Sequence, residues 1–114
     1  MTFRVEIAAL AERDVHDAYQ HIERDSPGRA VRWLQGLLEA VYELDSLPHR
    51  FARHECWSPT RDIRRFRYHS HQVIFEVNDS SGLVRILRVW HMSRQDPESQ
   101  DLPPELGPPS DSVE

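Results

Sequence analysis

The spacing of apolar residues predicts one strand and two helices in the first half of the chain. Residues 2–8 alternate Phe3, Val5 and Ile7 with polar positions, as a half-buried strand does. From about residue 9 to residue 23 the apolar positions recur every three or four residues, which predicts a helix with one buried face. That face consists of Ala11, Val15, Ala18, Tyr19 and Ile22.

The second predicted helix has clear signals at both ends. Ser26 is a favourable N-cap and Pro27 suits the first helical position, whereas Leu47-Pro48 closes the helix. The short connection at Asp25-Ser26-Pro27 makes the two helices an antiparallel hairpin. The apolar face of this helix comprises Ala30, Leu34, Leu37, Leu38, Val41 and Leu44, with Trp33 and Tyr42 beside it.

The second half of the chain reads as a loop followed by strands. Residues 49–60 have no regular period, and strands are predicted at 63–68, 72–77 and 83–91. The turn at 78–82 makes the last two strands a hairpin. The order β-α-α-β-β-β predicts an α+β fold in which an N-terminal strand and an antiparallel helical hairpin precede a three-stranded antiparallel meander. The helices should pack on one face of the sheet.

Alternation in the last strand leaves its two faces equally mixed. Strict alternation places Val84, Ile86, Arg88 and Trp90 on one face, and Arg85, Leu87, Val89 and His91 on the other. Neither set is purely apolar, so the pattern does not say which face meets the helices.

Composition divides the chain at residue 94. Residues 1–94 are expected to form one domain, whereas residues 95–114 hold five of the eight prolines and six acids without a base. This acidic, proline-rich tail is predicted to be disordered. It is either an inert extension or a segment that folds back and screens basic strands. Cys56 is the one cysteine, and no apolar run reaches the length of a membrane span, so a cytoplasmic protein is expected.

Positive charge is concentrated in the predicted meander. Residues 61–94 carry seven arginines and three acids, although the whole chain has a net charge of −5. Such a patch predicts a surface that meets an anionic partner. All fourteen basic residues are arginines, so every cation is a planar guanidinium, and a lysine base or Schiff base is excluded.

Short motifs occur in a consistent order over about residues 3–94. They are Ala11-x-x-Asp14-Val15, Ser26-Pro27-x-x-Ala30 with the Trp33-Leu34 helix, Leu44-x-x-x-Pro48, and the runs Arg64–Tyr68, Val73–Val77 and Ile86–His91. No single motif is specific, but their order and spacing together resemble the RelE/ParE superfamily of bacterial toxins from type II toxin–antitoxin systems.

The resemblance implies two alternative activities. RelE-like members are ribosome-dependent endoribonucleases that cut mRNA, whereas ParE-like members inhibit DNA gyrase by binding it. Both are neutralised by a cognate antitoxin encoded by an adjacent gene, and operator DNA is met only through that antitoxin. The resemblance implies no cofactor and no membrane partner.

RNA cleavage needs a general base, a general acid and cations that stabilise the phosphorane. If the chain were a nuclease, Arg65, Arg88 and His91 would be its catalytic candidates. RelE-like nucleases commonly carry a tyrosine at the end of the last strand, and none follows Tyr68 in this sequence. The lysines of RelE are missing as well. The ParE-like interpretation is therefore favoured, with the mRNA endoribonuclease and a non-toxic binding module of the same fold as alternatives.

The residues expected to bind the target or the antitoxin are mostly in the meander. They are Arg64, Arg65, Arg67, Arg88, Trp90, His91 and Arg94, together with Trp33 of the second helix. No metal site is expected. The histidines and the cysteine at positions 49, 54, 56, 69 and 71 match no common zinc spacing.

Overall fold

The structure is a computed structural model that describes residues 2–106. Its main elements are β1 (Arg4–Ile7), α1 (Ala9–Asp25), α2 (Pro27–Tyr42), β2 (Ile63–Tyr68), β3 (His71–Asn78) and β4 (Leu83–His91). Short 3₁₀ turns occur at Glu43–Asp45, Pro48–Arg50 and Ser99–Asp101. The predicted element order is confirmed, and the bounds of β2 and β4 coincide with those predicted from the sequence.

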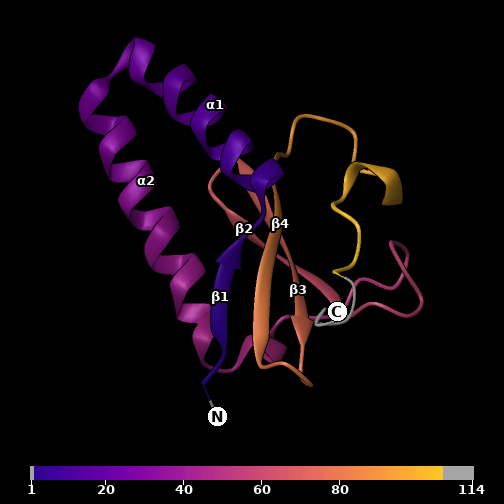
Figure 1. Ribbon diagram of the computed structural model, residues 1–114. Coiled ribbons are helices and arrows are strands. Elements are labelled where there is room, and N and C mark those ends of the chain that lie inside the picture. Colours follow the sequence, from indigo (N-terminus) through magenta and orange to yellow (C-terminus); the bar gives the residue numbers. More distant parts are fainter. Residues whose placement is uncertain (1, 107–114) are drawn as a thin grey trace, which may run out of the picture.

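The four strands form one sheet in the order β1-β4-β3-β2. Strand β1 is parallel to β4, and β2, β3 and β4 are successive antiparallel neighbours. Figure 1 shows the helical hairpin on one side of this sheet and the C-terminal segment on the other. The antiparallel meander and the helices packed on one face are therefore confirmed. No helix in the described range is long and apolar enough to cross a membrane.

The two helices meet at the predicted cap. The Ser26 hydroxyl accepts a hydrogen bond from the Arg29 amide at 3.3 Å, and Pro27 is the first helical residue. Helix α2 ends at Tyr42, however, and not at Leu47 as predicted. The chain tightens there into a 3₁₀ turn that still buries Leu44, so the apolar spacing continues past the end of the α-helix.

A hydrophobic core fills the space between the helical hairpin and the sheet. Helix α2 contributes Trp33, Leu37 and Val41, and the 3₁₀ turn adds Leu44. From the sheet come Phe3, Val73, Phe75, Val77, Val84, Ile86 and Val89. The predicted stripe of α1 packs against this core through the buried Ala11 and the half-buried Val15, Ala18, Tyr19 and Ile22.

A β-bulge changes which residues of β4 share a face. The register between β3 and β4 shifts after Ile74, so Leu87 is an extra residue on the β4 side. Val84, Ile86 and Val89 consequently face the helices, whereas Leu87 and Trp90 face away from them. Strict alternation placed Trp90 on the same face as Ile86, and Leu87 on the same face as Val89. Both assignments are wrong, because the bulge adds one residue to β4 and shifts the alternation after it.

The C-terminal segment covers part of the second face of the sheet. This face carries a smaller apolar cluster formed by Trp57, Ile63, Ile74, Leu87, Trp90 and Leu102. Leu102 belongs to the tail that was expected to be disordered from residue 95 onward. Residues 95–106 instead lie against the sheet, with Pro97, Leu102 and Pro103 buried. Residues 107–114, the rest of the predicted tail, lie outside the described residues.

Candidate recognition groove

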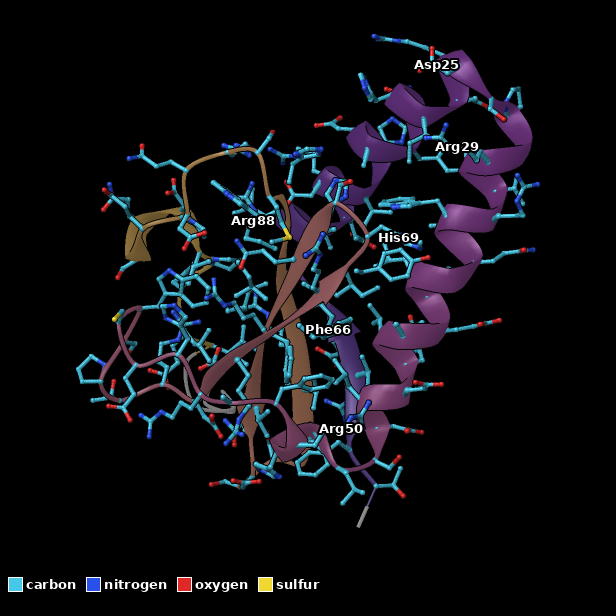
Figure 2. All side chains as sticks on the ribbon, turned by 180° about the vertical axis from the view of Figure 1, so that it is seen from behind. Asp25, Arg29, Arg50, Phe66, His69 and Arg88 are labelled. Carbon is cyan, nitrogen blue, oxygen red and sulfur yellow. The ribbon has the colours of Figure 1, made fainter. Side chains whose placement is uncertain are left out.

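A groove of about 780 Å³ lies between the helical hairpin and one end of the sheet. Its walls are α1, α2, the β2–β3 turn and the end of β4. Figure 2 shows Arg29 on α2 and His69 at the tip of the β2–β3 turn, two of the residues that line it. The apolar part of the lining consists of Ala18, Ile22, Trp33 and Val89.

Three guanidinium groups line this groove from different elements. Arg29 and Arg32 belong to the start of α2, and Arg94 follows β4. Within the described residues none of the three forms a salt bridge or donates a side-chain hydrogen bond. Arg94 stacks over the Trp90 ring, with its guanidinium carbon 3.6 Å from the ring centroid. Their charge is therefore available to a ligand.

Histidines form a second part of the groove lining. His71 is 8 % exposed, and its ring packs edge-on against His91 at 4.8 Å and against Trp33 at 5.4 Å. Burial and, to a smaller extent, the nearby His91 lower the pKa of His71 to about 4, against the opposite effect of Asp14. His71 is thus neutral at physiological pH and contributes shape and polarity, not charge.

The β2–β3 turn is held against α2 by a close contact. The Tyr68 hydroxyl donates a hydrogen bond to the Trp33 carbonyl at 2.8 Å. Gly36 makes this approach possible, because a Cβ atom there would overlap the tyrosine oxygen. Burial raises the pKa of Tyr68, and Glu39 raises it further. His69 follows with a positive φ of 51°, a conformation that sharpens the turn at the groove.

The predicted site residue Arg88 has a structural partner. Its guanidinium donates to both carboxylate oxygens of Asp14, at 2.7 and 2.9 Å, and both side chains are at most 14 % exposed. The hydrogen bond to Asp14 raises the pKa of Arg88. Asp14 also accepts from the Val89 amide at 3.0 Å, so this pair joins α1 to β4.

The arginines of β2 serve different purposes. Arg64 is held by Asp62 at 2.8 Å and donates to the carbonyls of His49 and Phe51, so it supports the preceding loop. Arg65 lies on the second face of the sheet and donates to Gln72 at 2.9 Å. Arg67 is exposed and donates to the His69 carbonyl at 3.0 Å.

The structure therefore separates six of the eight predicted recognition residues into two sets, while Arg64 and Arg88 are held by acidic partners. Trp33, His91 and Arg94 line the groove on the helix side. Arg65 and Arg67 line a smaller depression on the other side, and Trp90 is buried at 4 % exposure in the apolar cluster of the second face. The three nuclease candidates do not line one cavity, because Arg65 and His91 belong to different ones and Arg88 is bound to Asp14.

The sequence did not predict several residues of the groove. His21, Arg29 and Arg32 lie on the helices and His71 begins β3, where no motif marks them. The only available signal was the helical spacing of three between Arg29 and Arg32, which puts both on one side of α2. Their convergence with Arg94 depends on the angle of the hairpin, which the sequence does not encode locally.

One group of side chains has a geometry that could hold a metal ion. Ligand atoms of His49, Asp62 and Asp79 lie within 4.8 Å of one another. Asp62 is already bound by Arg64, and His49 contacts Asp79 directly at 2.9 Å. This group shares only His49 with the histidine and cysteine set considered from the sequence.

The sheet order, the helical hairpin and the groove between them define an α+β fold with one main groove between its two layers. A family model described as the ParE toxin of the type II toxin–antitoxin system parDE matches residues 5–96. The chain belongs to the ParE toxin family. A comparison with curated proteins gives no match.

Solved structures share the fold at low sequence identity. The chromosomal ParDE system of P. aeruginosa superposes with a TM-score of 0.63 at 20% identity, over 79% of this chain and 96% of that one. The RelBE2 toxin–antitoxin complex of Mycobacterium tuberculosis gives 0.54 at 23% identity, over 80% and 99%. The archaeal RelE–RelB complex of Pyrococcus horikoshii OT3 gives 0.51 at 20% identity, over 83% and 100%.

Proposed function

We propose that this member of the ParE toxin family acts by binding a protein target, DNA gyrase, and is neutralised by a cognate antitoxin from an adjacent gene. The observation that carries the proposal is the groove, in which Arg29, Arg32 and Arg94 have no acidic partner among the described residues. Guanidinium groups beside an apolar lining suit a protein segment that carries carboxylates.

Binding without catalysis is supported by the positions of the nuclease candidates. A general acid or base must lie within hydrogen-bond reach of the group it serves. Arg88 is committed to Asp14, and Arg65 lines a different cavity from His91. The structural relatives include toxin–antitoxin complexes, which supports an antitoxin as partner of this chain as well. A cytoplasmic location follows from both partners.

Induced expression without the antitoxin tests the proposal. Gyrase inhibition should stop growth with an SOS response and filamentation, and co-expression of the adjacent gene should restore growth. Rapid arrest of translation with cut mRNA ends would favour the endoribonuclease instead. Normal growth at full expression of folded protein would favour a non-toxic binding module.

Charge reversal in the groove locates the binding surface. The double variant Arg29→Glu, Arg32→Glu should lose antitoxin binding by about tenfold or more, because each lost charge-assisted contact costs about 1.5–3 kcal/mol. Arg24→Glu, on the exposed last turn of α1 and outside the groove lining, is the matched control. Equal affinity for the two variants in a titration would place the antitoxin elsewhere.

A further inference from the structure

A strap formed by residues 95–106 covers the second face of the sheet. All but its first two residues lie beyond residue 96, where the family match ends. Figure 1 shows this segment on the side of the sheet opposite the helices. The strap is thus an addition to the family's domain, and its contacts reveal what this face can bind.

Two tryptophans hold the strap through their indole N–H groups. Trp57 Nε1 donates to the Pro97 carbonyl at 2.7 Å, and Trp90 Nε1 donates to the Gln95 carbonyl at 3.0 Å. In return, the Ser99 hydroxyl donates to the Trp57 carbonyl at 2.8 Å. Both indoles are largely buried, so the bonds formed by their N–H groups are shielded from water.

Three arginines also donate to main-chain carbonyls of the strap, two of them from β4 and one from the loop that precedes β2. These contacts are Arg88 to Asp101 at 2.7 Å, Arg61 to Pro103 at 3.0 Å and Arg85 to Pro104 at 3.1 Å. Indole and guanidinium groups can only donate hydrogen bonds. This face therefore offers the strap a row of donors, two of which, Arg61 and Arg88, also bind the carboxylates of Glu76 and Asp14.

Prolines complement such a row of donors. Pro97, Pro103 and Pro104 have carbonyls that accept but no N–H that would need a partner. A segment rich in proline can consequently lie on this face without burying unsatisfied donors. An ordinary strand would present an N–H at every residue.

Charge and one apolar anchor complete the match. The strap carries four acids and no base, and Asp96 accepts from Gln72 at 3.1 Å and lies 3.6 Å from Arg65. Leu102 is 5 % exposed and packs in the apolar cluster with Trp57 and Trp90. The contacts of the strap with the face are thus main-chain acceptors, proline carbonyls among them, one acidic side chain and one leucine.

We propose that the second face of the sheet is a docking surface for extended, acidic, proline-containing segments, and that residues 95–106 occupy it in cis. A partner segment of the same chemistry binds there when the strap leaves. The proposal is independent of the antitoxin and of gyrase, since it concerns the opposite face from the groove.

A fluorescent synthetic peptide with the sequence of residues 95–106 tests the proposal. Leu102→Asp in the full-length chain places a charge in the apolar cluster and should release the strap. Leu106→Asp is the matched control, because Leu106 is in the same segment but 54 % exposed. The peptide should bind Leu102→Asp about tenfold or more tightly than the wild type or the control, as judged by fluorescence anisotropy.

Proteolysis and circular dichroism show whether the substitution releases the strap from a domain that is still folded. Glutamyl endoprotease should cut at Glu98 and Glu105 faster in Leu102→Asp than in the control, while circular dichroism shows the helices intact. If Leu102→Asp does not fold, the milder Leu102→Ala takes its place with the same expectations.

Three results would overturn the proposal. The first is a folded variant whose strap is cut rapidly but which binds the peptide no more tightly than the wild type. The second is a strap that stays protected from the protease in both variants. The third is that Leu102→Asp binds a labelled single-stranded RNA and not the peptide.

Discussion

Asp14 shows how one carboxylate can join two distant parts of the chain. It accepts from the Arg88 guanidinium through both oxygens and from the Val89 amide, in a site that is mostly shielded from water. The short motif that contains Asp14 did not predict Arg88 as its partner, because the two residues are more than seventy positions apart in the sequence. The same contact explains why Arg88 is not free for recognition.

Asp14→Ala should be strongly destabilising. It leaves the buried Arg88 charge with the Asp101 carbonyl but without its carboxylate partner, which typically costs about 3–5 kcal/mol of the free energy of unfolding. Urea denaturation measures the loss. Glu6→Ala is the control, since the Arg4–Glu6 pair is exposed and should contribute within about 1 kcal/mol. Similar losses for both would show that the buried pair has no special weight.

His71 should make stability depend on pH. Its pKa is about 4 in the folded chain and about 6.5 when unfolded, so between these values the unfolded state binds more protons. The contribution of His71 to the free energy of unfolding is complete above about pH 6.5. It is lost as the pH falls towards 4, and the loss is up to about 3 kcal/mol. His71→Phe should make the free energy of unfolding depend less on pH between pH 5 and about 6.5, as measured by urea denaturation.

At the level of elements, Gly36 sets how closely β2 and its turn approach α2. A helical glycine normally costs about 1 kcal/mol relative to alanine. Here the Tyr68 hydroxyl occupies the space that a Cβ atom would need. Glycine at this position therefore lowers the intrinsic stability of the helix but permits the Tyr68 contact that fixes one wall of the groove.

The sign of Gly36→Ala should depend on Tyr68. In the wild type the substitution should destabilise by about 1–3 kcal/mol through overpacking. In a Tyr68→Phe background the hydroxyl is gone, and the same change should be neutral or stabilising by up to about 1 kcal/mol. A double-mutant cycle by chemical denaturation measures this coupling. A loss of equal size in both backgrounds would contradict it.

The elements that the sequence predicted well have local causes. Ser26 and Pro27 mark a helix start by their own chemistry, and β2 and β4 stand between clear turn signals. The bulge at Leu87 has no such mark, because a two-residue period assumes a uniform pleat. One inserted residue was enough to reverse the face assignment of the last three residues of β4 relative to its first half.

At the scale of the whole molecule, the strap changes the extent of the folded unit. Acidic residues and prolines predicted disorder because they bury little apolar surface. The segment is held by carbonyl groups, which every residue has, and by the single anchor Leu102. Amino-acid composition reveals neither the main-chain carbonyls nor the position of a single leucine. The groove was predictable only in part, since its helical arginines meet β4 through tertiary packing.

A chain that ends after Arg94 should be less stable than the full chain. It would expose the cluster around Trp57 and Trp90 and leave their indole N–H groups without the strap carbonyls. Loss of the Leu102 contacts alone predicts a cost of about 2 kcal/mol or more. Thermal unfolding should show a lower midpoint. An unchanged midpoint would mean that residues 1–94 are the complete folded domain.

The short β1 strand has a consequence for self-association. It pairs only with Leu83–Ile86, so the remainder of β4 has no strand neighbour on that side within the described residues. Open strand edges are templates for aggregation. Helix α1 blocks this one, with Asp14 taking the Val89 amide, and β2 at the other edge carries Arg65 and Arg67. Both edges are thus protected against the strand-to-strand stacking that leads to insoluble protein, even before any partner has bound.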